Sequence, residues 1–85
     1  MNPVPEIKRF LLRALARLKG IPWPDELLEE SARQSLVPKP LLSDIREARR
    51  DLEAGGYLQG HRDEMDGAIT WTLTAKGQHA ARQLE

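Results

Sequence analysis

The stretch that decides the fold is DLEAGGYLQGHRDEMDGAITWTLTAKG, which runs from Asp51 to Gly77. It begins inside a charged helical segment, passes two glycines, and then changes its hydrophobic period from 3.6 to 2. Ile69, Trp71 and Leu73 alternate with threonines, which predicts a strand with one buried face. The change of period predicts that a helix gives way to a sheet within one short segment.

The residues around that strand complete a β-hairpin. Asp66-Gly67 predicts a two-residue turn, because a type I′ turn needs positive φ. The partner strand is expected to start at Tyr57-Leu58. Gly55-Gly56 ends the preceding helix, since one glycine can adopt the left-handed cap. Thr74 is expected to cap a last short helix over residues 75–84.

Three helical segments precede the hairpin, over residues 5–19, 24–35 and 40–54. In each, apolar residues recur every three to four positions, the spacing of one buried helix face. Prolines in residues 21–24 and 37–40 separate them, because a proline disfavours helical geometry in the residue before it. Leu12 points away from the first stripe. The expected inward-facing residues are Ile7, Phe10, Leu11, Ala14, Leu15 and Leu18, then Leu28 and Ala32, then Leu41, Ile45, Ala48 and Leu52.

Composition limits the class of protein. The 85 residues predict one α+β, mostly helical domain over residues 1–85, without cysteines to form disulfides or thiolate metal sites. No apolar run approaches the ~20 residues of a membrane span and no secretion signal is present, so we expect a cytoplasmic protein without membrane contact. The net charge is zero, but residues 1–20 are basic and residues 21–38 acidic.

The order helix, helix–turn–helix, hairpin, helix leads to a resemblance. Residues 40–77 look like the core of a winged helix-turn-helix domain. "IREARRDLEAGGYL", the polar hairpin and "WTLTAKG" resemble the recognition helix, wing and closing strand of the bacterial MarR and PadR-like regulators. The chain lacks the long additional helices through which those regulators dimerise, so we expect a monomer or weak dimer.

The resemblance implies contact with double-stranded DNA through the outer face of the helix over residues 40–54. Arginine can bind guanine edges or phosphates, serine can reach either, and glutamate can accept from cytosine. Residues flanking the helix and near the hairpin tip would touch phosphates. The implied DNA-binding residues are Lys39, Ser43, Arg46, Glu47, Arg50 and Arg62.

A second interpretation of these charges remains open. Glu47–Arg50, Arg50–Glu53 and Arg49–Glu53 have the spacing of ordinary helix-surface ion pairs. The tip "GHRDEMDG" is acidic, which suits a solvated turn or a wing that meets a protein. His61 with its neighbouring acids does not predict a metal site, because consecutive residues on a hairpin tip point in different directions.

Two other surface features have alternative interpretations. Arg9, Arg13 and Arg17 form a basic stripe, which could follow a DNA backbone but which we expect to be a solvated face or to pair with the acidic helix over residues 24–35. Trp23 either covers the small core or, with Leu12, serves as an exposed anchor for a partner.

The sequence predicts a small bacterial or phage winged-helix DNA-binding protein, either a transcription regulator or an accessory factor of DNA transactions. The alternative is a winged-helix protein–protein interaction module without DNA binding. Nothing resembles a nucleophile–base pair, paired catalytic carboxylates or a phosphate-binding loop. We therefore expect no enzymatic activity, no cofactor and no metal.

Overall fold

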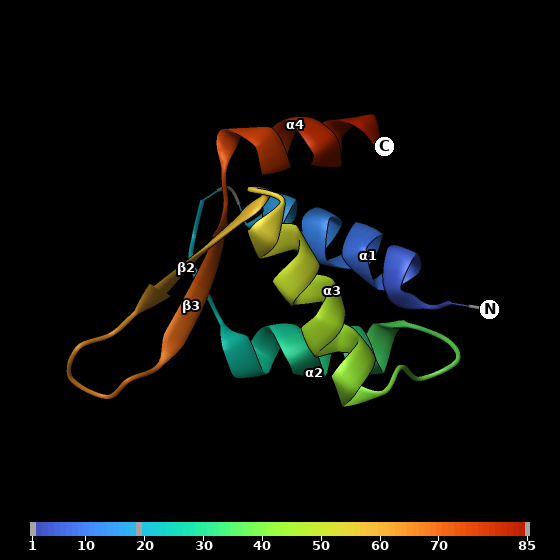
Figure 1. The fold of residues 1–85 in the computed structure, drawn as a ribbon, viewed down its shortest axis with the longest axis horizontal. Helices are drawn as coiled ribbons and strands as arrows, with labels where there is room; N and C mark the ends of the chain where they lie inside the picture. Colours follow the sequence, from blue (N-terminus) through green and yellow to red (C-terminus); the bar gives the residue numbers. More distant parts are fainter. Residues whose placement is uncertain (1, 19, 85) are drawn as a thin grey trace.

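The computed structural model describes residues 2–18 and 20–84. Within these residues, four helices and three short strands follow one another in the order helix, strand, helix, helix, strand, strand, helix (Figure 1). The hairpin extends away from the helices, α4 lies at one end of the molecule, and α2 lies at the other. The elements are α1 (Val4–Arg17), β1 (Trp23–Pro24), α2 (Asp25–Ser35), α3 (Leu42–Ala54), β2 (Leu58–Arg62), β3 (Ile69–Leu73) and α4 (Ala75–Gln83).

This is the predicted winged helix-turn-helix arrangement. α2 and α3 form the helix–turn–helix pair, β2 and β3 form the wing, and α1 and α4 close the core. The predicted end of the first helix at Lys19 lies outside the described residues. Among the described residues, no helix is both long enough and apolar enough to cross a membrane.

The core draws on every helix and on two strands of the sheet. α1 is the central helix, in contact with α2, α3, α4 and β3. Its neighbours on several sides explain why Leu12, predicted to point away from the core, is instead buried. The buried apolar residues are Val4, Ile7, Leu11, Leu12, Leu15, Leu28, Ala32, Ile45, Ala48, Leu52, Leu58, Trp71 and Ala81.

The start of α3 differs from the prediction. Leu41 was expected to face inward, but 68% of its surface is exposed. It has extended backbone geometry (ψ 146°) and stands before the first helical residue, Leu42. It is therefore outside the helical phase on which the prediction depended.

The sheet has one strand more than the sequence predicted. β3 is central, and its antiparallel partners are β2 on one side and the two-residue β1 on the other. Trp23 of β1 lies opposite Trp71 of β3, half-buried and packed against the core. This placement favours the interpretation of Trp23 as a residue that covers the core. Trp71 is the buried residue of β3, with Ile69 and Leu73 half-buried beside it.

The predicted two-residue turn at Asp66-Gly67 is wrong. Strand pairing ends at Arg62 opposite Ile69, and residues 63–68 form a longer loop. The amide N–H of Asp63 donates to the Ala68 carbonyl (2.8 Å), and that of Gly67 donates to the Asp63 carbonyl (2.9 Å). Gly67 does have the expected positive φ, 75°. The Asp-Gly signal therefore marked the right place but the wrong loop length.

The end of α3 is held against the start of α4. Gly56 has φ 82°, and the amide of Tyr57 donates to the Leu52 carbonyl (2.9 Å), the pattern of a glycine-terminated helix. Thr74 caps α4 as predicted, because its Oγ1 accepts from the Gly77 amide (3.1 Å). The same hydroxyl donates to the Gly56 carbonyl (2.6 Å).

Lys76 and Gly77 complete this junction. Lys76 Nζ donates to the Gly55 carbonyl (2.7 Å) and lies 4.5 Å from the centre of the Tyr57 ring. A Cβ on Gly77 would come within 2.1 Å of the Tyr57 carbonyl oxygen, so only glycine fits there. The segments "AGGY" and "LTAKG" therefore contact each other directly, and together they fix where the hairpin leaves the helices.

Candidate nucleic-acid interface

The outer face of α3 is the first part of the candidate site. Ile45, Ala48 and Leu52 are buried, and helical geometry turns the opposite face to solvent. All four residues that the resemblance implied on this face are exposed: Ser43, Arg46, Glu47 and Arg50. Their outward direction is as expected from the helical phase.

A groove between α3 and the wing is the second part. Its volume is about 360 Å³. Arg50 of α3 and Arg62 of β2, both predicted site residues, come together here. Arg49, Glu53, Gly60, Ile69 and Trp71 complete the lining. Arg49 is paired with carboxylates of α2, so the excess positive charge of this lining comes from Arg50 and Arg62 against Glu53.

The other predicted residues lie outside this groove. Lys39 is exposed in the turn before α3 and lines a smaller, apolar depression beside Asp44. Ser43 and Glu47 lie along the exposed face of α3, nearer its start. The structure thus unites two of the six predicted residues in the groove and spreads the rest along α3 and the turn before it.

The arginines of α3 differ in their partners. Arg46 Nε lies 3.5 Å from Glu29 Oε2 of α2, with 52% of its side chain exposed. Arg50 makes no ion pair within residues 2–18 and 20–84. The helix-spaced pairs of Glu47 with Arg50 and of Arg49 or Arg50 with Glu53 are likewise absent from these residues. Arg50 therefore keeps its charge available to a ligand.

Arg49 joins three elements, which the sequence did not indicate. It donates from Nη1 to Asp25 Oδ1 and to Glu29 Oε1 (3.3 Å), both on α2. Its guanidinium carbon lies 5.5 Å from the centre of the Trp71 ring. Trp71 Nε1 in turn donates to Asp25 Oδ1 (2.8 Å). We call Asp25, Glu29, Arg49 and Trp71 the Arg49 network.

The Arg49 network fixes the position of α3 against the wing. Arg49 has 16% of its side chain exposed and Glu29 13%, so both charges are largely enclosed and paired. Trp71 belongs to β3 of the wing, whereas its hydrogen-bond acceptor belongs to α2. The network consequently holds α2, α3 and β3 at one relative position.

The acidic tip of the wing has a local structural explanation. Asp63 Oδ1 accepts from the Met65 amide (2.7 Å), and Asp66 Oδ1 accepts from the Ala68 amide (2.8 Å). Each carboxylate therefore stabilises the loop two residues on, as aspartate often does in turns. Within the described residues there is no group of three or more histidines and acids arranged to hold a metal ion.

The basic stripe on α1 faces solvent, as one of the two expectations had it, and within the described residues it forms no ion pair with α2. Arg9, Arg13 and Arg17 are exposed, and the contact of Arg13 is with the Leu84 carbonyl (3.4 Å). Asp25 and Glu29 of α2 form their ion pairs with arginines of α3 instead. The expected solvent-facing stripe is therefore confirmed, whereas the net charges of the two segments did not show which helix surfaces lie against each other.

Comparison with known proteins supports the fold. No protein-family model matches the chain, and no curated protein matches it. A structure of a ZitR mutant from Lactococcus lactis in apo form has a TM-score of 0.71 and 17% identity, covering 95% of this chain and 55% of that one. A second ZitR mutant has a TM-score of 0.71 and 18% identity, covering 93% of this chain and 49% of that one. The chain thus spans about half the length of ZitR.

A further similar structure is that of TM0937, described as a conserved protein of unknown function and a potential transcriptional factor. Its TM-score is 0.69 at 18% identity, covering 93% of this chain and 71% of that one. The TM-scores show a shared winged-helix fold, and at identities this low they show the fold alone. Function must be argued from the site itself.

Proposed function

We propose that this protein binds double-stranded DNA, with α3 in the major groove and the wing along the phosphate backbone, as a transcription regulator or an accessory factor of DNA transactions. The observation that carries the proposal is the convergence of Arg50 and Arg62 on one open, electropositive groove between α3 and β2. The fold that it shares with a potential transcriptional factor supports the same function.

The surroundings of each arginine suggest its role. Arg50 is exposed, has no acidic partner within the described residues, and is suited to a guanine edge or a phosphate. Arg62 on the wing is suited to a phosphate across the groove. Arg46 is paired with Glu29, so it contributes less to affinity than Arg50. Ser43 and Glu47 would face bases, and Lys39 would contact a phosphate before α3.

The expected electrostatic contribution is small. Three to five phosphate contacts are expected from the basic groups on this face, which corresponds to a log–log salt slope of roughly −3 to −4.5. Affinity for random duplex should therefore be weak and should fall further as salt is added. A steeper slope would require basic groups that this face does not offer.

The experiment compares two double variants with equal changes in charge. Arg50→Ala/Arg62→Ala removes the two exposed groove arginines and leaves the paired Arg49 in place, whereas Arg9→Ala/Arg17→Ala removes two exposed charges from α1. Fluorescence anisotropy with a short duplex at low salt should show at least about tenfold weaker binding for the first variant only. Equal losses in both variants would mean non-specific attraction and would reject the assignment to α3 and the wing.

A second candidate function, protein–protein interaction without DNA binding, is favoured by one observation. Met65 is 95% exposed at the wing tip, between acidic residues that would approach DNA phosphates. A tip of this kind suits a protein partner. An NMR titration with duplex DNA distinguishes the two: shifts along α3 and β2 support DNA binding, whereas no shifts at low salt favour the interaction module.

A further inference from the structure

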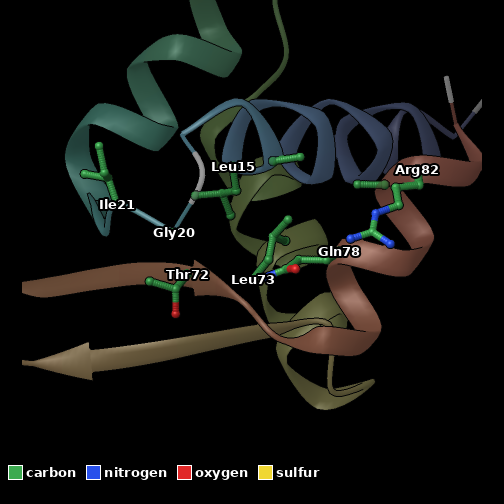
Figure 2. Close-up of a pocket in the computed structure, with 9 residues that line it drawn as sticks. Leu15, Gly20, Ile21, Thr72, Leu73, Gln78 and Arg82 are labelled. Atoms are coloured by element: carbon green, nitrogen blue, oxygen red, sulfur yellow. The ribbon is translucent and has the colours of Figure 1, made fainter.

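A second cavity lies between α1, β3 and α4, separate from the groove between α3 and the wing. Its volume is about 410 Å³, within the range of pockets that bind small molecules. Figure 2 shows Gln78 and Arg82 projecting from α4 toward Leu73, with Leu15 of α1 and residues 20–21 on the other side. Three elements of the fold thus form its walls.

The lining is apolar at its base and basic at its rim. Leu15 and Ala81 are buried core residues, and Leu73 is half-buried beside them. Ile21, at the rim, leaves 63% of its surface exposed. Among the described residues that line it, none is acidic and Arg82 has the one charged side chain. An apolar ligand body would cover Ile21, while an anionic group would meet Arg82.

The side chains on two faces of α4 differ in whether their hydrogen-bond donors have partners among the described residues. Gln83 Nε2 lies 3.0 Å from His79 Nε2, so this i, i+4 pair is joined on one face of the helix. Gln78 and Arg82 have the same i, i+4 spacing on the face toward the cavity. Neither side chain has a hydrogen-bond or ion-pair partner within residues 2–18 and 20–84. Their amide and guanidinium donors therefore point at the cavity without an acceptor.

We propose that this cavity binds a small amphiphilic carboxylate: one anionic head group on an aliphatic body. The carboxylate accepts hydrogen bonds from the Arg82 guanidinium, whose planar fork matches its two oxygens, and from the Gln78 amide. The aliphatic body lies on Leu15, Leu73 and Ile21, where it removes apolar surface from water. The proposal does not depend on DNA binding, because none of these residues belongs to the α3 groove.

Octanoate is the probe that tests the proposal, in an NMR titration of the full chain. The expected affinity is weak, on the order of 1 mM, as suits a ligand of few atoms in an open cavity. Amide shifts should concentrate at residues 15–16, 20–21, 72–73 and 78–82. Octylammonium, with the same chain and the opposite charge, should bind markedly more weakly. Equal binding of the two probes, or shifts spread over the whole surface, would overturn the proposal.

Two variants and a matched control test the geometry. Arg82→Gln removes the charge from an exposed side chain and should weaken octanoate binding about five- to tenfold. Ala16→Leu should fill the cavity from α1 and abolish binding. Ala14 lies on another face of α1, where it lines a depression between α1 and α2. Ala14→Leu should therefore leave the affinity for octanoate unchanged. Undiminished binding in either cavity variant would show that octanoate binds elsewhere.

Discussion

Replacing Arg49 by alanine tests whether the Arg49 network holds the domain together. Arg49 lies one residue before Arg50, yet the two side chains have opposite environments. Arg49 is paired with two carboxylates of α2 and lies over the Trp71 ring. Arg50 is exposed and has no ion pair within the described residues. Arg50→Ala is therefore a matched control for the same change of residue on the same helix.

The magnitude follows from burial. Arg49→Ala removes the cation paired with Asp25, whose side chain is 25% exposed, and one of the two cations paired with Glu29, whose side chain is 13% exposed and which keeps its contact with Arg46. Breaking a fully buried pair from one side costs about 3–5 kcal/mol, and the partial exposure here lowers this to about 2–4 kcal/mol. A chain of this length has a total stability of about 4–13 kcal/mol. The melting temperature should fall by about 10–25 °C.

Far-UV circular dichroism is the appropriate assay, because tryptophan fluorescence would report the changed surroundings of Trp71 as well as unfolding. Urea and thermal unfolding should show the loss for Arg49→Ala and a change within about 0.5 kcal/mol for Arg50→Ala. A double-mutant cycle with Asp25→Ala should give a coupling energy of about 1–3 kcal/mol. Equal stability of the two arginine variants, with zero coupling, would mean that the network contributes no more than surface ion pairs do.

Three further predictions concern packing and assembly. Trp71→Ala should cost about 3–5 kcal/mol in chemical denaturation, because Trp71 is 5% exposed in the core; unchanged stability would refute its placement. Gly77→Ala should lower the free energy of unfolding by at least about 2 kcal/mol, because the added Cβ would lie 2.1 Å from the Tyr57 carbonyl oxygen. Helix propensity alone predicts a gain of about 1 kcal/mol instead, so a stabilised variant would contradict this close contact. The chain should sediment as a monomer or weak dimer, and a tight dimer at micromolar concentration would contradict this.

Local signals explain the parts of the fold that the sequence predicted well. The left-handed geometry of Gly56, the cap at Thr74 and the outward direction of Arg46 and Arg50 each depend on residues within about one helical turn. The alternation around Trp71 similarly marked β3. In these places the backbone geometry that the residues favour is also the geometry that the fold uses.

The predictions were wrong where contacts between segments distant in the sequence determine the local structure. β1 has two residues, too few for any period, and exists because Trp23 lies opposite Trp71 in the sheet. Leu12 is buried because α1 has neighbours on several sides, which its own periodicity does not show. The Asp66-Gly67 signal predicted a tight turn, but a longer loop is closed by two hydrogen bonds, one donated by the Asp63 amide to the Ala68 carbonyl and one accepted by the Asp63 carbonyl from the Gly67 amide.

The candidate site likewise has a part that the sequence predicted and a part that only the tertiary structure shows. Helical phase alone indicated which α3 residues face outward. It could not show that α2 carboxylates pair with Arg46 and Arg49, because those contacts join residues 17 to 24 positions apart. It also could not show that Arg62 shares a groove with Arg50. The sequence therefore indicated where the side chains point, and the tertiary structure shows which of them remain available.

The residues that carried the family resemblance make hydrogen bonds within the fold. Thr74 bonds to Gly56 and Gly77, and Lys76 bonds to Gly55, so the two motifs exist to join the end of α3 to the start of α4. In this chain these residues are used by contacts within the fold. The motif is therefore a signature of the winged helix and carries no information about DNA. The proposed DNA binding therefore rests on Arg50 and Arg62, which line one groove and have no ion-pair partner in the described part of the chain.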